Sequence, residues 1–288
     1  MSDPSPVVTW RSLLAETASS VGGRAHARWM CETAASVSSA ELDSMLDDHP
    51  THRMVRHLDS MVERARLGEP IQYVLGRWGF RHLDLAVDRR VLIPRPETEA
   101  VVEVAVDLAS ATGPTRVVAD LGTGSGAIAL ALADELPVVG TTVWMTDVSS
   151  DALAVAQANL AGLGRAAVNV RIAQGSWCDA LPAGVDFDVI VANPPYVADA
   201  SDELEAIVRD WEPPGALFAG ADGLDAIREI VPAAIARLRP GGSCVIEHGH
   251  DQGPRVRALM ASAGYVEVRT RSDLSGSDRV TSARRPGA

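Results

Sequence analysis

Residues 117–132, "VVADLGTGSGAIALAL", contain a strand, a glycine-rich turn and the start of a helix in direct succession. The apolar run leads to Asp120, three glycines follow at Gly122, Gly124 and Gly126, and a second apolar run has a helical length. Glycine lets the backbone turn sharply and approach a ligand closely, and the free N–H groups of a helix start face that ligand. The stretch therefore predicts a nucleotide-type ligand at the turn. The turn alone is shared by NAD, FAD and other nucleotide binders, although its GxGxG spacing is tighter than the GxGxxG dinucleotide pattern.

The sequence on the C-terminal side of this unit repeats the alternation of strand and helix patterns. It predicts strands at 116–122, 141–148, 168–174, 187–193, 243–249, 266–271 and 279–284, and helices at 96–109, 126–136, 149–162, 223–238 and 252–263. Such alternation predicts an α/β fold with a doubly wound, mostly parallel seven-stranded sheet. The last two strands are joined by "SDLSGSD" without a helix, so one of them should run antiparallel.

The sequence on the N-terminal side predicts two further parts. Residues 1–75 show short apolar stripes typical of helices, and Ser38 with Glu41 fits a capping box. Helices this short are unstable singly, so we expect a small helical bundle. In residues 76–95, "LDLAV" and "RVLI" alternate around "DRR" and predict a linking β-hairpin. Residues 96–288 would then form the sheet domain.

Composition limits the kinds of partner and compartment. The net charge is −12 and all 26 basic residues are Arg, so a duplex DNA binder is disfavoured while a basic protein partner is compatible. Residues 1–75 carry 7 Arg against 10 acids and the rest 19 against 28, so neither part suits phosphate. The N-terminus lacks a signal peptide and no apolar run spans a bilayer. We expect a cytoplasmic protein without membrane contact.

Cysteine and histidine spacing predicts no metal site. The three cysteines, Cys31, Cys178 and Cys244, lie far apart and are expected to be buried thiols. His248 and His250 alternate like a zinc pair, but they lack a third ligand nearby. We interpret both as structural.

Asp147 ends the second strand of the sheet domain, 21 positions after Gly126. A carboxylate at this place can accept the two hydroxyl groups of a ribose. The alternative is that Asp147 caps the next helix, a role that Ser149 or Ser150 would fill equally well. The glycine turn upstream favours the ribose interpretation.

The fourth strand runs into "NPPY", Asn193–Pro194–Pro195–Tyr196. Two prolines make a stiff, non-helical corner at the carboxyl edge of the sheet, where ligands bind in open α/β folds. The Asn193 side-chain oxygen and the Pro194 carbonyl can each accept one hydrogen of a planar NH₂ group, and Tyr196 offers a ring face. The motif therefore predicts a site that grips an amide or an exocyclic amine. The alternative is a strand-to-loop turn without a ligand.

Together these motifs resemble S-adenosylmethionine (AdoMet) dependent methyltransferases that act on planar nitrogens. The stretches "LGEPIQYVLG", "VLIPRPETE", "WEPPGALFAG" and "EHGHDQG" narrow the resemblance to the HemK-like release-factor glutamine N5-methyltransferases. "IPRPETE" and "EHG" favour this family over the related ribosomal-protein glutamine methyltransferases. The resemblance implies a Rossmann-like methyltransferase fold, AdoMet as cofactor and release factors as substrates. It further implies that residues 1–75 form a substrate-recognition domain, and we expect a monomer.

The resemblance also assigns site residues. It places AdoMet on Asp120, Gly122, Thr123, Gly124, Ser125, Gly126, Asp147, Trp177 and Asn193. It places the substrate on Asn193, Pro194, Pro195 and Tyr196, with Asn193, Pro194 and Tyr196 catalytic and Glu97 and Glu99 shaping the pocket. The family commonly has an acid where this chain has Ser176, so a carboxylate contact to adenine would have to come from another residue, and Asp179 is the candidate substitute.

Two other function classes compete with this hypothesis. An adenine-N6 or guanine-N2 nucleic-acid methyltransferase would use the same corner on a flipped base. The acidity and the missing basic target-recognition domain disfavour it. A non-catalytic nucleotide-binding scaffold would leave the NPPY acceptors without a purpose.

Overall fold

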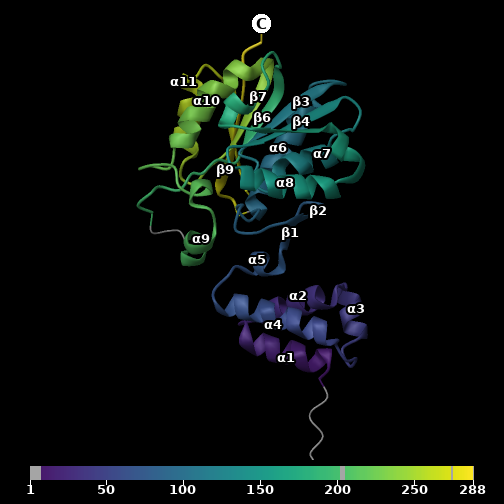
Figure 1. Ribbon diagram of the computed structural model, residues 1–288. Helices are drawn as coiled ribbons and strands as arrows, with labels where there is room; N and C mark the ends of the chain where they lie inside the picture. Colours follow the sequence, from purple (N-terminus) through teal and green to yellow (C-terminus); the bar gives the residue numbers. More distant parts are fainter. Residues whose placement is uncertain (1–7, 202–204, 274, 288) are drawn as a thin grey trace, which may run out of the picture. The chain divides into compact units, whose positions relative to one another are not determined.

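The computed structural model describes residues 8–201, 205–273 and 275–287. The chain divides into two compact units, Met1–Arg77 and Trp78–Ala288. Figure 1 shows their elements, and each unit is described by itself.

The first unit is a bundle of helices. They are α1 (Trp10–Ser20), α2 (Arg24–Ala35), α3 (Ser39–Ser44), α4 (His52–Arg66) and α5 (Ile71–Leu75). Their shared core contains Trp10, Met30, Leu42, Leu58 and Met61, all at most 1% exposed. Ser38 caps α3 and Glu41 reciprocates, which confirms the predicted capping box.

A two-stranded sheet of β1 (Arg77–Phe80) and β2 (Leu83–Ala86) stands where a hairpin is expected, but its strands differ from the prediction. "LDLA" forms β2, as predicted. Its partner strand is β1, which precedes it in the chain, and not "RVLI", which follows it. Val91 and Ile93 are buried without forming a strand. The backbone N–H of Ile93 donates to the Glu212 side chain instead, at 3.0 Å. Burial inside a loop therefore produced the alternation that resembled a strand.

The sheet of the second unit has the strand order β5-β4-β3-β6-β7-β9-β8 among the described residues. Its strands are β3 (Arg116–Leu121), β4 (Thr141–Asp147), β5 (Val170–Gln174), β6 (Phe187–Ala192), β7 (Leu238–Glu247), β8 (Val266–Ser272) and β9 (Asp278–Arg284). Strand β9 runs antiparallel to both neighbours, as predicted from the helix-free connection. The other pairings are parallel, so β3, β4 and β6 end at one edge.

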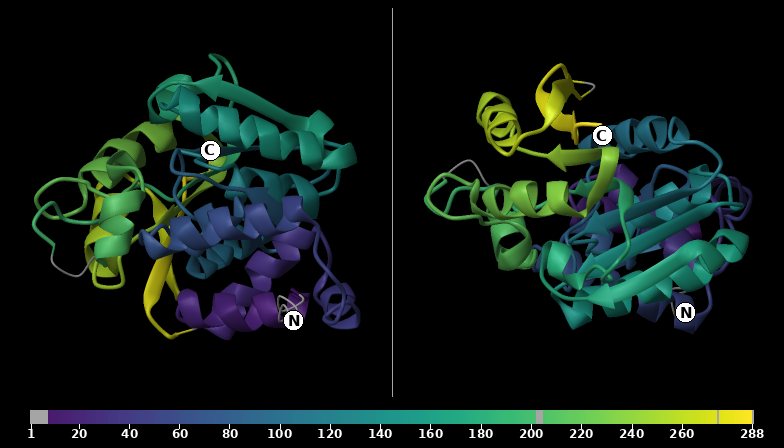
Figure 2. Two further views of the ribbon diagram at one scale, coloured as in Figure 1. Left: turned by 60° about the horizontal axis from the view of Figure 1, so that its bottom comes forward. Right: turned by 90° about the horizontal axis from the view of Figure 1, so that it is seen from above.

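Helices cover both faces of this sheet, as the views in Figure 2 show. One face packs against α6 (Glu99–Ser110), α7 (Ala127–Glu135) and α8 (Ser150–Gly162). The other packs against α10 (Asp225–Arg237) and α11 (Gly253–Ser262). Every residue of β6 is buried, which explains why its sequence is apolar apart from Asp188.

Several boundaries differ from the predicted ones. The helix expected at 96–109 begins as a 3₁₀ turn (Pro96–Thr98) before α6, and β7 starts at Leu238 rather than 243. Strand β5 starts at Val170 because the residues before it, Gly164–Asn169, form a 3₁₀ helix. Helix α9 (Ala206–Trp211) and the 3₁₀ turns Trp177–Ala180 and Pro214–Ala216 had no clear sequence pattern. None of the helices in the described part of the chain has the length and apolarity needed to cross a membrane.

Candidate active site

A cavity of about 420 Å³ lies at the carboxyl ends of β3, β4 and β6. Strand order reverses between β3 and β6, which is where open α/β sheets bind ligands. Its volume falls within the range of small-molecule sites. The predicted site residues that line it are Gly122, Thr123, Gly124, Ser125, Asp147, Trp177, Asn193 and Pro195. The structure thus brings the glycine turn, Asp147 and the NPPY corner together around one cavity.

The glycine turn depends on backbone angles that other residues adopt only with strain. Gly122, Gly124 and Gly126 have φ of 71°, 56° and 87°. At Gly122 the constraint is also steric, since an added Cβ would lie 2.9 Å from the Trp177 ring. The turn therefore presents bare backbone to the cavity with the indole packed against it.

Asp120 lies beneath the turn, fully buried, rather than on the cavity wall. Its Oδ2 accepts hydrogen bonds from the Thr123 hydroxyl at 2.6 Å and from the Ala129 N–H at 3.1 Å. Burial raises the pKa of this carboxyl to about 7, against the lowering effect of those two donors. Asp120 thus ties the turn to the first turn of α7.

Asp147 ends β4 with its carboxylate on the cavity. Its Oδ2 accepts from the Gly124 N–H and its Oδ1 from the Ser149 N–H, both at 2.9 Å. Each carboxylate oxygen keeps a further lone pair for a ligand hydroxyl. Ser149 is the N-cap of α8 and accepts from Ala152, so the capping role belongs to Ser149 and Asp147 is held for the cavity.

Trp177 and Ser176 line the cavity beyond Gly175, whereas Asp179 is exposed and lies outside the lining. The Trp177 indole N–H donates to Glu229 Oε2 at 3.2 Å, which fixes the ring. Trp177 has a φ of 39°, an uncommon angle for a non-glycine residue. The described side chains therefore do not place a carboxylate from this loop on the cavity, and Asp179 remains only a prediction.

Asn193 and Pro195 of the NPPY corner line the cavity, while Pro194 and Tyr196 do not. The Asn193 Nδ2 donates to the Thr98 hydroxyl oxygen at 3.1 Å, and no hydrogen bond to its Oδ1 is found among the described residues, so Oδ1 can accept one from a ligand. The Tyr196 hydroxyl donates to Glu247 Oε1 at 3.3 Å. Burial raises the pKa of Tyr196 well above its ordinary value. Tyr196 is thus a neutral, anchored ring.

The "PETE" segment contributes to the cavity through Thr98 and not through its acids. Glu97 is exposed, and Glu99 Oε1 accepts from the Arg81 backbone N–H at 3.0 Å. Neither acid lines the cavity, so an effect of Glu97 or Glu99 on the pocket would be indirect. Thr98 is 4% exposed and contacts Asn193. The sequence did not predict a role for Thr98, because a threonine between two acids has no local pattern that indicates a contact with residue 193.

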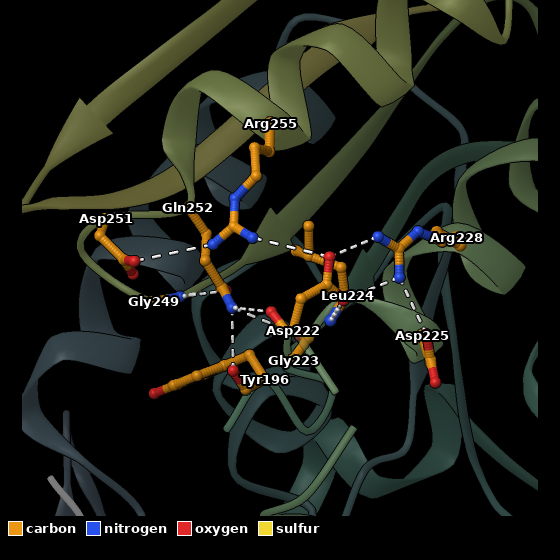
Figure 3. A network of polar contacts seen from close by, with 10 residues as sticks. All are labelled: Tyr196, Asp222, Gly223, Leu224, Asp225, Arg228, Gly249, Asp251, Gln252 and Arg255. Atoms are coloured by element: carbon orange, nitrogen blue, oxygen red, sulfur yellow. Dashed lines mark hydrogen bonds and ion pairs between the residues drawn. The ribbon is translucent and has the colours of Figure 1, made fainter. Parts of the chain in front are cut away.

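Gln252 fastens the loop that follows the NPPY corner (Figure 3). Its Nε2 donates to the carbonyl of Tyr196 at 2.9 Å, and to those of Asp222 and Gly223 at 3.4 Å. Its Oε1 accepts from the Gly249 N–H at 2.9 Å. One buried amide therefore joins three loops, including the corner itself.

A second buried group holds the segment before α6. Glu212 is 3% exposed and binds Arg95 together with the Ile93 N–H. Arg95 and the neighbouring Pro213 both line the cavity. The stretches "VLIPR" and "WEPP" are thus fixed to each other beside the site.

His248, one of the two histidines that alternate like a zinc pair, has partners within the protein. His248 is buried, and its ring nitrogens contact Thr281 Oγ1 and the Gly249 carbonyl, both at 2.8 Å. Burial lowers its pKa. Cys31, Cys178 and Cys244 are free and buried. No group of three or more potential ligands that could hold a metal occurs among the described side chains.

Comparison with known proteins matches both units. Residues 9–76 match the PrmC N-terminal domain, and residues 103–210 match the methyltransferase small domain. A release factor glutamine methyltransferase from Coxiella burnetii is 40% identical over 262 residues, 91% of this chain and 92% of that protein. The chain belongs to the release factor glutamine methyltransferase family. Another family member, from Xylella fastidiosa strain Temecula1, is 48% identical over 79% of this chain and 81% of that protein.

This membership makes the chain a methyltransferase that uses AdoMet as the methyl donor. Among solved structures, a Thermus thermophilus 16S rRNA N2 G1207 methyltransferase in complex with AdoMet and guanosine has a TM-score of 0.52 and 20% identity. It covers 73% of this chain and 49% of that chain, and the likeness concerns the fold alone. The Rossmann-like methyltransferase fold expected from the sequence is confirmed.

Proposed function

We propose that the chain transfers a methyl group to the side-chain amide nitrogen, N5, of the glutamine in the Gly-Gly-Gln loop of peptide-chain release factors. The observation that carries the proposal is the Asn193 amide at the cavity, with Nδ2 engaged by Thr98 and Oδ1 left as an acceptor. A site that presents acceptors suits a neutral NH₂ group, which has two hydrogens to donate.

The chain's contribution to the reaction is positioning. A glutamine amide is a poor nucleophile because its lone pair is delocalised into the carbonyl. Asn193 Oδ1 at the cavity and the Pro194 carbonyl, which lies outside the cavity lining, would each take one hydrogen of the substrate amide. This would turn the lone pair toward the incoming methyl group. The same two acceptors stabilise the positive charge that grows on nitrogen in the transition state. Two prolines keep this corner rigid, as preorganisation requires.

The cavity fits AdoMet in size and in the groups on its wall. When bound, AdoMet supplies an electrophilic methyl group on its sulfonium. Asp147 would hold the ribose hydroxyls, Trp177 would flank the adenine, and the backbone of Gly122–Ser125 would lie against the methionine portion. Asp120 would act from below by keeping the turn in shape.

The charge of the chain supports a protein substrate. The net charge of −12 is unfavourable for a phosphate backbone, and release factors bind ribosomal RNA and so offer basic surface. We assign residues 1–75 to recognition of the intact factor, and residues 76–95 to a linker. A monomer in the cytoplasm that does not bind nucleic acid fits this role.

Asp147→Ala is expected to weaken AdoMet binding by on the order of 1–3 kcal/mol, the scale of lost charge-assisted hydrogen bonds. The substitution removes the ribose acceptor and releases the N–H groups of Gly124 and Ser149. Isothermal calorimetry with AdoMet and with its demethylated product measures the change. Asp151→Ala, an exposed acid in the next helix, is the matched control. Unchanged affinity in Asp147→Ala would remove this residue from the cofactor site.

The substrate assignment is tested by incubating the enzyme with labelled AdoMet and an intact release factor. Mass spectrometry should locate one added methyl group on the glutamine of the Gly-Gly-Gln loop. A factor with Glu in place of that Gln keeps nearly the same size but lacks the NH₂ group, so it should accept no methyl group. Methyl groups found on DNA or RNA adenines or guanines, with none on the factor, would contradict the proposal and favour the nucleic-acid alternative.

A further inference from the structure

Asn159 of α8 makes three hydrogen bonds through one side-chain amide, all within the second unit. Its Oδ1 accepts from the backbone N–H of Ala86 at 2.7 Å, and its Nδ2 donates to the carbonyl of the same residue at 3.0 Å. Nδ2 also donates to the carbonyl of Ser125 at 2.8 Å. Ala86 is the last residue of β2, which lies beside α8 (Figure 1), and Ser125 belongs to the glycine turn at the cavity. One amide therefore joins the hairpin strand β2 to the candidate cofactor site.

The three contacts leave the Asn159 amide only one favourable orientation. Its NH₂ group donates to two carbonyl oxygens, and its Oδ1 faces an N–H group. A flipped amide would place Oδ1 against a carbonyl oxygen and NH₂ against the N–H, so the hydrogen bonds would be lost. Toward Ala86 the amide offers one donor and one acceptor, the pair that a residue of a neighbouring strand would offer. Asn159 thus takes the place of a neighbouring strand at the end of β2.

The contact to Ser125 holds a part of the glycine turn that lines the cavity. Ser125 is 3% exposed, and Asn159 is the one hydrogen-bond donor found for its carbonyl oxygen among the described residues. The next N–H along the chain, that of Gly126, donates to the Thr123 carbonyl at 2.8 Å. The peptide between Ser125 and Gly126 is therefore held at both its oxygen and its N–H. Loss of the Asn159 amide would leave a buried carbonyl unpaired, which costs free energy and favours a displaced turn.

We propose that Asn159 is a positioning residue for AdoMet, which couples the docking of the hairpin to the shape of the glycine turn. The inference rests on the proposed placement of AdoMet at this turn, and it does not depend on the methyl acceptor. Coupling between two sites is reciprocal, so AdoMet should strengthen the contact at Ala86 just as that contact favours AdoMet. Strand β1 begins at Arg77, the last residue of the first unit. The coupled hairpin is therefore the segment that directly follows the proposed substrate-recognition domain in the chain.

The first test is calorimetry of AdoMet binding to variants of the full chain. Asn159→Ala and Asn159→Asp should each weaken AdoMet binding by about 5–20-fold, the scale of one or two lost hydrogen bonds. Aspartate has nearly the size of asparagine but its carboxylate cannot donate, so a role in packing alone would leave the affinity of Asn159→Asp unchanged. Gln157→Ala is the matched control, because Gln157 is an exposed amide on the same helix. It should bind AdoMet as the wild-type protein does.

The second test is backbone hydrogen exchange, measured by NMR with and without saturating AdoMet. In the wild-type protein AdoMet should slow the exchange of the Ala86 N–H by about 3–10-fold, which a merely structural contact would not show. The Arg81 N–H is the internal control, since it also donates to one side chain, Glu99 Oε1 at 3.0 Å, and Glu99 does not line the cavity. Its exchange should change by less than about 2-fold. In Asn159→Ala the Ala86 N–H should exchange fast and at the same rate with and without AdoMet.

Wild-type AdoMet affinity in Asn159→Asp, or an Ala86 exchange rate that does not respond to AdoMet in the wild-type protein, would overturn the inference. Thermal unfolding shows whether each variant is folded, and the wild-type exchange data decide the coupling if Asn159→Ala is not. Weakened binding in Asp147→Ala with normal binding in both Asn159 variants would contradict this inference and leave the cofactor site in place. A wild-type enzyme that shows the coupling but leaves the release factor unmethylated would contradict the proposed function alone.

Discussion

Asn193→Ala is expected to lower kcat for methylation of the release factor by about 10²–10³-fold, the usual loss when one preorganised electrostatic partner of a transition state is removed. The substitution deletes the Oδ1 acceptor and the donor to Thr98 together. AdoMet affinity should fall by less than about tenfold, because one neutral hydrogen bond is worth about 0.5–1.5 kcal/mol. Single-turnover kinetics and calorimetry measure the two quantities separately.

The matched control is Asn169→Ala. The Asn169 side chain also makes a hydrogen bond within the protein, to the Val138 carbonyl at 2.6 Å. It lies immediately before β5, at the end of the strand opposite to the cavity. We expect near wild-type kcat and AdoMet affinity in this variant. Equal losses of turnover and cofactor affinity in Asn193→Ala would instead make Asn193 a simple binding residue.

The elements that carry the site could be predicted because each has a local signal. The turn after β3 is marked by glycines whose backbone angles require them, and the antiparallel β9 by a connection too short for a helix. Asp147 could be placed because an acid at the end of the strand after a glycine turn has a known geometric role. Local patterns of this kind follow from backbone geometry and do not depend on contacts with distant residues. They can therefore be recognised in the sequence alone.

The contacts that complete the site could not be predicted, because they join segments far apart in the chain. Thr98 meets Asn193 across 95 positions, and Glu212 meets Ile93 across 119. Threonine and glutamate at these places carry no periodicity and no motif spacing. The wrong hairpin strand has the same origin, since the Ile93 N–H of "RVLI" donates to Glu212 of the distant "WEPP" segment and not to a neighbouring strand.

Buried amides illustrate the same limit. Gln252 in "EHGHDQG" contributes to a family resemblance, but its role depends on three loops that meet only in the folded chain (Figure 3). Arg255 and Arg228 reinforce this junction by contacting Asp222 from two sides. The NPPY corner is thus held in place by Asp222 and Gln252, which follow it by more than twenty residues, as well as by its two prolines.

Gly223→Ala tests the junction that Gln252 makes, and it is expected to have the largest effect on stability. Gly223 has a φ of 72°, and an added Cβ would lie 2.2 Å from the Tyr196 carbonyl oxygen and 2.8 Å from Gln252 Nε2. Both atoms belong to the hydrogen bond that holds the corner, so the backbone of Tyr196 must move and the bond is lost. We expect the free energy of unfolding to fall by about 2–4 kcal/mol, the range of strained or clashing substitutions.

Gly184→Ala separates backbone strain from the clash. Gly184 has a φ of 75° in the same unit, and a Cβ there would meet nothing within 4 Å. Gly184→Ala should lower the free energy of unfolding by about 1–2 kcal/mol, the strain of an alanine in the left-handed conformation alone. Urea unfolding of both variants gives the difference between them. Because Tyr196 follows Asn193 by three residues, Gly223→Ala should also lower kcat more than AdoMet affinity, whereas Gly184→Ala should change neither. If the two variants unfold alike and turn over alike, the Gln252 junction does not hold the corner in place.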